Sequence, residues 1–159
     1  MIEHYERPEI CSLCTDVCCA RMPGIMWPED VKRAGGTDNI GDALRAVLST
    51  GNYAIDWWVG DPRGMALDCT LRGYFVRPRV ARRWSLFDPA WDGGPCVFWN
   101  KATGCRLPAE QRPNECRNLE PRPGRECIQH GGYKRDAAIA WWPWRHLVGT
   151  VGHELEPEA

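Results

Sequence analysis

The sequence has little net charge, no long apolar run and no leader-like start. Lys and Arg total 20 and Asp and Glu total 21 in 159 residues, so the formal net charge is −1. A nearly neutral chain has no bulk electrostatic attraction to nucleic acid or to acidic lipid. No apolar run approaches membrane-spanning length, and the polar, mixed-charge start has no secretory h-region. We therefore expect a cytoplasmic protein that does not enter a membrane.

The usual short catalytic motifs are also missing. The chain contains no GxxxxGK phosphate loop, no GxSxG nucleophile elbow, no HExxH pair and no radical-generating CxxxCxxC. Its four histidines are scattered along the chain. The sequence therefore assigns no catalytic residue, and whether the protein is an enzyme stays open.

What the sequence has in excess is cysteine. Nine cysteines occur, and eight of them form two groups, at 11–19 and 96–127, with Cys69 alone between them. An odd count is unusual for a fully disulfide-bonded secreted protein, which argues against a disulfide scaffold. In a reducing compartment, clustered thiols indicate metal or redox chemistry.

The early group runs Cys11-Ser-Leu-Cys14-Thr-Asp-Val-Cys18-Cys19. Thiols at CxxC spacing can reach one ion from a single turn, and on a helix Cys11, Cys14 and Cys18 would share a face. Cys19 would point about 100° away from Cys18 on such a helix. It therefore serves either a second centre or another side of a polynuclear cluster.

The late group begins with an expected hairpin, in which Cys96 precedes a short apolar strand and Cys105 lies on the return strand. Cys116 follows an Arg-Pro pair that is typical of a helix start, where the helix dipole favours a thiolate. Cys127 follows a proline-rich loop, and His130, three residues later, could replace it as a ligand.

These motifs, in this order, resemble the YkgJ-type cysteine-cluster family, which has a zinc- or iron-chelating domain. The match covers roughly residues 11 to 127. It departs from the family pattern in having three residues, not two, before the CC pair, and in Cys69, which has no counterpart. The matching positions are Cys11, Cys14, Cys18-Cys19, Cys96, Gly104-Cys105 and the Arg112-Pro113-Asn114-Glu115-Cys116-Arg117 signature.

Two metal assignments are open, because soft thiolates suit both zinc and iron–sulfur clusters. Closed zinc sites would be structural, whereas an iron–sulfur cluster would allow electron transfer. The family resemblance favours the iron–sulfur cluster over Zn²⁺. Alternatives are a zinc-stabilised module that binds nucleic acid or protein, and an iron–sulfur-dependent modification enzyme. The predicted metal ligands are Cys11, Cys14, Cys18, Cys19, Cys96, Cys105, Cys116 and Cys127.

Two further segments are candidates for partner binding. A run of arginines interleaved with aromatics has the composition of a single-strand binding surface, although a solvated strand edge and loop is the favoured interpretation. Three tryptophans near the end are the best candidates for an exposed protein-binding patch. The first set is Arg77, Arg79, Arg82 and Arg83 with Tyr74, Phe75 and Trp84; the second is Trp141, Trp142 and Trp144.

We expect one small, irregular, loop-rich α+β domain over residues 1–159, organised around metal, with 20–95 as a helix and strand segment between the cysteine groups. Pro28 and its acidic neighbours predict a short helix that ends at Gly35-Gly36, and Thr37 is expected to cap a second helix that ends near Gly51. Strands are expected at 52–60 and 73–80. A last helix is expected at 136–142, interrupted at Pro143, with fraying from 154 to 159.

Overall fold

The computed structural model describes residues 21–64, 68–117, 119–122, 125–129 and 134–156. Its central element is an antiparallel pair of strands, β1 (Tyr53–Val59) and β2 (Arg72–Pro78). Each residue of β1 has a partner in β2, from Tyr53 opposite Pro78 to Val59 opposite Arg72. The predicted strand pair and the predicted small α+β fold are therefore confirmed.

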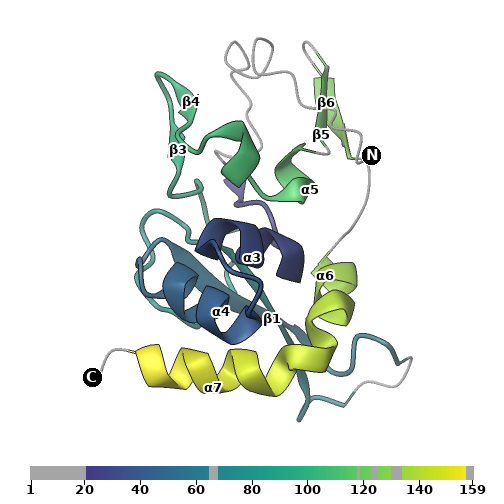
Figure 1. The fold of residues 1–159 in the computed structure, drawn as a ribbon. Coiled ribbons are helices and arrows are strands. Elements are labelled where there is room, and N and C mark those ends of the chain that lie inside the picture. Colours follow the sequence, from purple (N-terminus) through teal and green to yellow (C-terminus); the bar gives the residue numbers. More distant parts are fainter. Residues whose placement is uncertain (1–20, 65–67, 118, 123–124, 130–133, 157–159) are drawn as a thin grey trace.

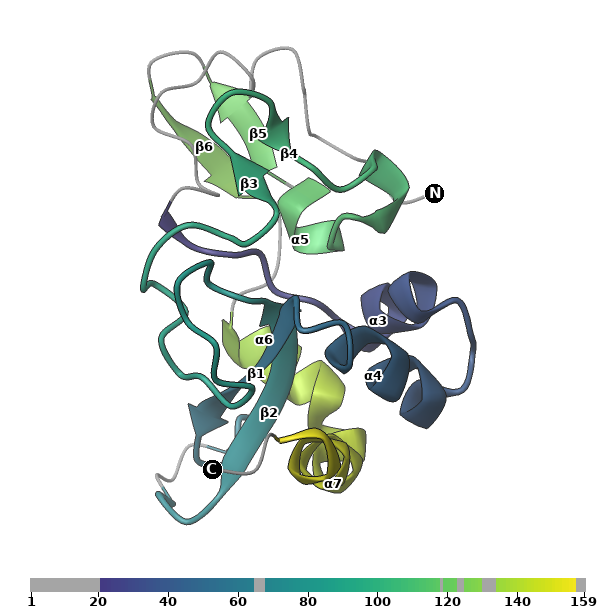
Figure 2. The same cartoon turned by 90° about the vertical axis from the view of Figure 1, so that its left-hand side faces the viewer.

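Four helices pack around this strand pair (Figures 1 and 2). They are α3 (Pro28–Gly35), α4 (Ile40–Leu48), α6 (Lys134–Trp141) and α7 (Arg145–Leu155). The loop that follows β2 lies along the edge of β1 that β2 leaves free, where Ile55 N donates to Leu86 O at 2.7 Å. Within the described part of the chain, no helix is both long and apolar enough to cross a membrane.

The two predicted helices before the sheet are present, with one difference in capping. Helix α3 starts with Pro28 at N1, as expected. Helix α4 is capped by Asn39, whose Oδ1 accepts from Asp42 N at 3.0 Å, and not by Thr37. The hydroxyl of Thr37 instead accepts from Asn39 N, so it orders the turn before the cap.

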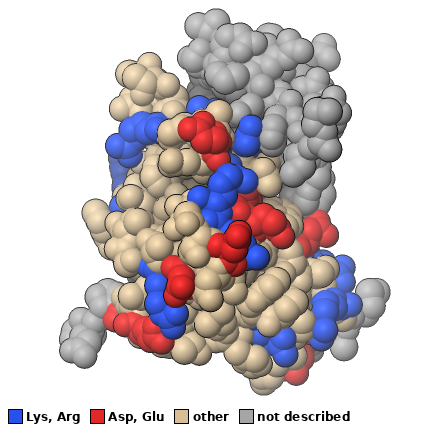
Figure 3. All heavy atoms as spheres, viewed as in Figure 1, with Lys and Arg blue, Asp and Glu red and all other residues tan. Residues whose placement is uncertain are grey.

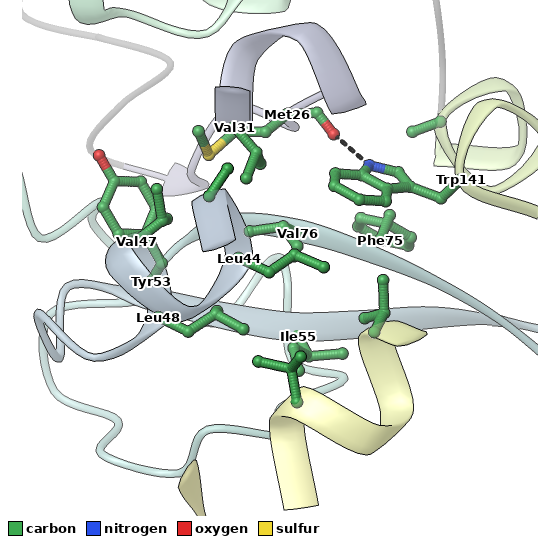
Figure 4. Close-up of a cluster of buried hydrophobic side chains, with 14 of the residues drawn as sticks. Met26, Val31, Leu44, Val47, Leu48, Tyr53, Ile55, Phe75, Val76 and Trp141 are labelled. Carbon is green, nitrogen blue, oxygen red and sulfur yellow. Dashed lines mark hydrogen bonds between the residues drawn. The ribbon is translucent and has the colours of Figure 1, made fainter. Parts of the chain in front are cut away.

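The core lies between the helices and β1–β2, and Figure 4 shows its centre. The apolar stripe of α4 faces the strands through Leu44, Val47 and Leu48, all at most 3% exposed. Trp141 of α6 is fully buried, and its Nε1 donates to Met26 O at 2.8 Å (dashed in Figure 4). Burial of side chains this large is the main stabilising contribution to such a fold.

A cluster of buried ion pairs lies beside this core. Arg77 is fully buried, and its guanidinium lies 3.1 Å from Asp56 Oδ2 and 3.4 Å from Asp88 Oδ2. Arg83 also bonds Asp88, at 2.9 Å, and Lys134 lies 3.5 Å from Asp56. Burial raises the pKa of Asp88, but hydrogen bonds from Arg83 and the backbone, and the charges of both arginines, outweigh it and hold that pKa below its ordinary value.

The carboxyl end differs from the prediction. The helix that we expected to stop at Pro143 continues as a 3₁₀ turn at Trp142–Trp144 and then as α7, which includes Glu154 and Leu155. Pro143 lies at the start of the 3₁₀ turn, where a missing N–H is tolerated. The expected fraying from residue 154 is therefore wrong for 154 and 155.

A smaller set of elements forms the end of the molecule opposite α7 (Figures 1 and 2). It comprises the hairpin β3 (Trp99–Asn100) and β4 (Gly104–Cys105), a 3₁₀ turn at Ala109–Gln111, α5 (Asn114–Arg117), and the strand pair β5 (Leu119–Arg122) and β6 (Arg125–Gln129). The predicted hairpin is confirmed, with shorter strands than expected. This end of the molecule carries the late cysteine group.

Candidate metal centre

The late cysteines lie on separate elements of the smaller end. Cys96 precedes the β3–β4 hairpin and is 7% exposed, and Cys105 is on β4. Cys116 is on α5, and Cys127 belongs to β6, although its side chain lies outside the described residues. The four early cysteines, Cys11, Cys14, Cys18 and Cys19, and the candidate ligand His130 also lie outside the described residues.

The described chain begins just after the early cysteine group, and residues 23–27 run between the two ends of the molecule. We call this segment the 23–27 strap. Hydrogen bonds with distant parts of the sequence hold three of its five residues. Trp91 Nε1 donates to Pro23 O at 2.9 Å, Ile25 N donates to Glu115 Oε2 at 2.6 Å, and Met26 N donates to Val76 O at 2.9 Å.

The strap touches the late cysteine group directly at Gly24. A Cβ atom built on Gly24 would lie 2.0 Å from Cys116 Sγ, so the sulfur occupies the space that any other residue would need. Gly24 is five residues after Cys19 in the sequence. The sulfur of a late cysteine therefore lies against backbone that continues, within a few residues, from the early group.

Helix α5, which carries Cys116, is attached to α3 by one buried carboxylate. Asp30 Oδ1 accepts from Asn114 N at 3.0 Å and from Arg33 Nη2 at 2.7 Å. Its Oδ2 accepts from Trp27 N at 2.8 Å. Burial raises the pKa of Asp30 in spite of these bonds. Asp30 thus joins the start of α5, the start of α3 and the strap, and so sets the position of Cys116.

Glu115, next to Cys116, accepts a hydrogen bond from the strap at Ile25 N. Burial raises its pKa to about 8; the nearby Asp30 charge adds to the rise, and the bond from Ile25 N opposes it. An ionised Glu115 would repel a thiolate at the neighbouring Cys116, so the rise in its pKa reduces that repulsion.

Cys96 and Cys105 form a second thiol neighbourhood. Burial raises the pKa of Cys96 to about 11. A backbone hydrogen bond with Phe98 opposes this rise, the charge of Cys105 adds to it, and the charges of Arg77 and Arg106 oppose it. Burial, followed by the charges of both cysteines, raises the pKa of Tyr53 to about 12. Without a cation nearby, Cys96 therefore stays a protonated thiol, and metal coordination is what would ionise it.

The three described late cysteines do not assemble a complete site among themselves. Over the residues that the structure describes, no three Cys, His, Asp or Glu side chains are grouped as metal ligands. A four-ligand thiolate centre at Cys116, or at Cys96 and Cys105, would therefore take further ligands from residues 1–20 or from side chains between 118 and 133. Those ranges hold the five other predicted cysteine ligands.

Cys69 stands apart from this arrangement. It is an exposed free thiol just before β2. His153 is placed by packing, since its ring lies 5.0 Å from that of Phe87. Neither residue lies in a cluster of described metal-binding side chains.

Both candidate partner-binding segments are corrected by burial. Arg77 and Phe75 are fully buried and Arg79 is 6% exposed, so the arginine run does not form one surface. The buried Arg77 and Arg79 instead donate hydrogen bonds to carboxylates and backbone carbonyls. The spacing of residues along a strand does not reveal such partners. Trp141 is fully buried and Trp142 is 6% exposed, so the three C-terminal tryptophans do not form an exposed patch.

Sequence reasoning missed Gly24 and Asp30 as site residues. Both act through contacts with residues more than 80 positions away, which no local pattern indicates. No known protein family, no curated protein and no solved structure matches this chain. The geometry and the chemistry of the residues therefore carry the functional argument.

Proposed function

We propose that this is a metal-binding protein whose early and late cysteine groups bind shared thiolate centres. The contact between Cys116 Sγ and Gly24 is the observation that carries the proposal. Five residues of chain span at most about 18 Å, so Cys19 lies within that distance of Gly24. This bound supports a shared location for the two groups, which are 77 residues apart from Cys19 to Cys96.

The chemistry of the late group suits such a centre. Its donors are soft thiolates. Cys96 is buried, which limits water around its sulfur, whereas Cys105 and Cys116 are half-buried. Arg77 and Arg106 both lower the pKa of Cys96 through their charges, which reduces the cost of ionising it. Loss of thiol protons on binding makes the metal affinity increase with pH.

We favour an iron–sulfur cluster over zinc, and membership of the YkgJ-type family, on the motif order set out above. When bound, an iron–sulfur cluster supplies one-electron transfer, whereas a closed zinc site supplies folding free energy. This chain's own residues hold the donors in place: Asp30 positions α5, and Glu115 and Trp91 hold the strap.

Anaerobic purification followed by elemental analysis and a visible spectrum tests the proposal. We expect iron with matching sulfide and a brown colour; colourless protein with zinc would keep the metal site and change the metal. Cys116→Ser should lose metal from its centre, and Cys69→Ser is the matched control that should retain all of it. Equal metal content in both variants would refute the assignment of Cys116 as a ligand.

A further inference from the structure

An open pocket lies at the end of the molecule away from the late cysteines, between the start of β2 and the start of α7. Its volume is about 410 Å³, within the range of small-molecule sites, roughly 300 to 1,000 Å³. Figure 3 shows Lys and Arg atoms at the lower right of the molecule, with Asp and Glu atoms beside them. The residues lining the pocket include Thr70, Leu71, Tyr74, Trp142 and the basic residues Arg72, Arg145 and His146.

The two arginines of the pocket are held by aromatic rings. The Arg72 guanidinium lies 4.5 Å from the ring centre of Trp57, and the Arg145 guanidinium lies 4.2 Å from that of Trp142. Stacking uses the face of a guanidinium and leaves its N–H edges for ligands. One Arg145 N–H is used by Trp142 O, at 2.8 Å. Two arginines from different elements are therefore oriented in advance at one pocket.

The carboxylates near the pocket are already engaged. Asp61 accepts both Nε and Nη2 of Arg63, at 3.1 and 2.9 Å. Those bonds, with the charges of Arg63 and Arg145, lower the pKa of Asp61 to about 2. Asp68 accepts from the backbone N and the hydroxyl of Thr70. No carboxylate of the described residues pairs with Arg72, which is exposed.

We propose that this pocket binds a phosphate monoester carried on a small apolar or ring-shaped body. Guanidinium edges match phosphate oxygens bidentately, and two of them with an imidazole N–H suit a dianion better than a single carboxylate. Leu71, Tyr74 and Trp142 provide apolar walls for the body of the ligand. The site is distinct from the candidate metal centre in position and in chemistry.

Calorimetric titration of the full-length protein tests this with phenyl phosphate as the probe, and with phenol, benzoate and inorganic phosphate as comparisons. Phenyl phosphate should bind saturably and more tightly than each comparison. Arg72→Gln and Arg145→Gln each remove a charged hydrogen bond to the phosphate. Each should therefore weaken the binding of phenyl phosphate by about tenfold or more. Arg72→Lys should lie between Arg72→Gln and the parent protein.

Arg82→Gln is the control, because Arg82 is an exposed arginine outside the pocket and its loss should leave binding unchanged. Melting curves of the variants identify any that fail to fold, and exposed Arg72 carries the test if Arg145→Gln does not fold. No saturable binding of phenyl phosphate, equal binding of benzoate, or equal losses in Arg82→Gln and Arg72→Gln would each overturn the proposal.

Discussion

Replacing Gly24 by alanine tests the convergence of the two cysteine groups without removing any proposed ligand. The added Cβ would lie 2.0 Å from Cys116 Sγ. Ordinary contact between such atoms needs about 3.5 to 4.0 Å. The sulfur or the strap must therefore move by about 1.5 Å or more. Metal–ligand distances tolerate only about 0.2 Å, so a displacement of that size should remove Cys116 from its centre.

The expected result for Gly24→Ala is a loss of metal together with a loss of stability. Overpacking of this kind costs about 1 to 3 kcal/mol of unfolding free energy. Elemental analysis gives the metal per chain, and urea unfolding of the metal-free protein separates the packing cost from the metal contribution. The matched control is Gly64→Ala, where the nearest atom to an added Cβ is Asp61 O at 3.8 Å.

The reasoning would be refuted if Gly24→Ala kept the metal content and spectrum of the parent protein. That result would mean that the sulfur of Cys116 can move freely without affecting the metal, and so is no ligand. Metal loss in Gly64→Ala as well would show that the assay responds to general perturbation and not to the strap.

Three further predictions concern the rest of the molecule. Gly152→Ala should lower the unfolding free energy by about 1 kcal/mol or more, measured with urea, because its Cβ would lie 2.5 Å from Phe87 Cζ. Asp88→Asn should lower the unfolding free energy by about 3 kcal/mol and flatten the pH dependence of urea unfolding in acid. The pKa of Asp88 is lower in the folded protein than in the unfolded chain. Its stabilising contribution is therefore complete above the unfolded-state pKa of about 3.9 and is lost as the pH falls through the folded-state pKa. Cys69→Ser should remove one fast-reacting thiol from native protein in a thiol-reagent assay and leave the metal content unchanged, whereas buried Cys96 should react only after unfolding.

Each of these has a discriminating outcome. Gly149→Ala should be tolerated, because its added Cβ would lie 3.4 Å from Tyr74. Equal losses of unfolding free energy in Gly149→Ala and Gly152→Ala would therefore contradict the packing argument. A parent-like acid slope in Asp88→Asn would show that another carboxylate governs acid unfolding. An unchanged count of fast-reacting thiols in Cys69→Ser would show that this side chain is not accessible in solution.

Local sequence signals predicted the elements that depend on neighbours along the chain. The proline and acids at the start of α3, the apolar stripe of α4 and the alternation in β1 each indicated an element that the structure contains. Capping was less predictable. Thr37 and Asn39 are both good N-cap residues and lie two positions apart, so the local sequence does not decide which of them caps the helix.

Helix α7 shows where local reasoning fails. Two glycines and a preceding Pro143 lower the intrinsic helix propensity of this segment. Tertiary packing reverses that preference, because Gly152 lets the helix approach Phe87 and Ile55 more closely than any side chain would allow. A residue unfavourable to an isolated helix is therefore required by the packed one.

The sequence alone determined the cysteine spacing, most elements of secondary structure in the main sheet and its first helices, and the absence of familiar catalytic motifs, because these depend on residue identity and near neighbours. Only the tertiary structure decided that Arg77 is a buried ion-pair partner, that the C-terminal tryptophans belong largely to the interior, and that Cys116 lies against Gly24. The physical reason is that burial and close contact depend on which distant segments fill the same space.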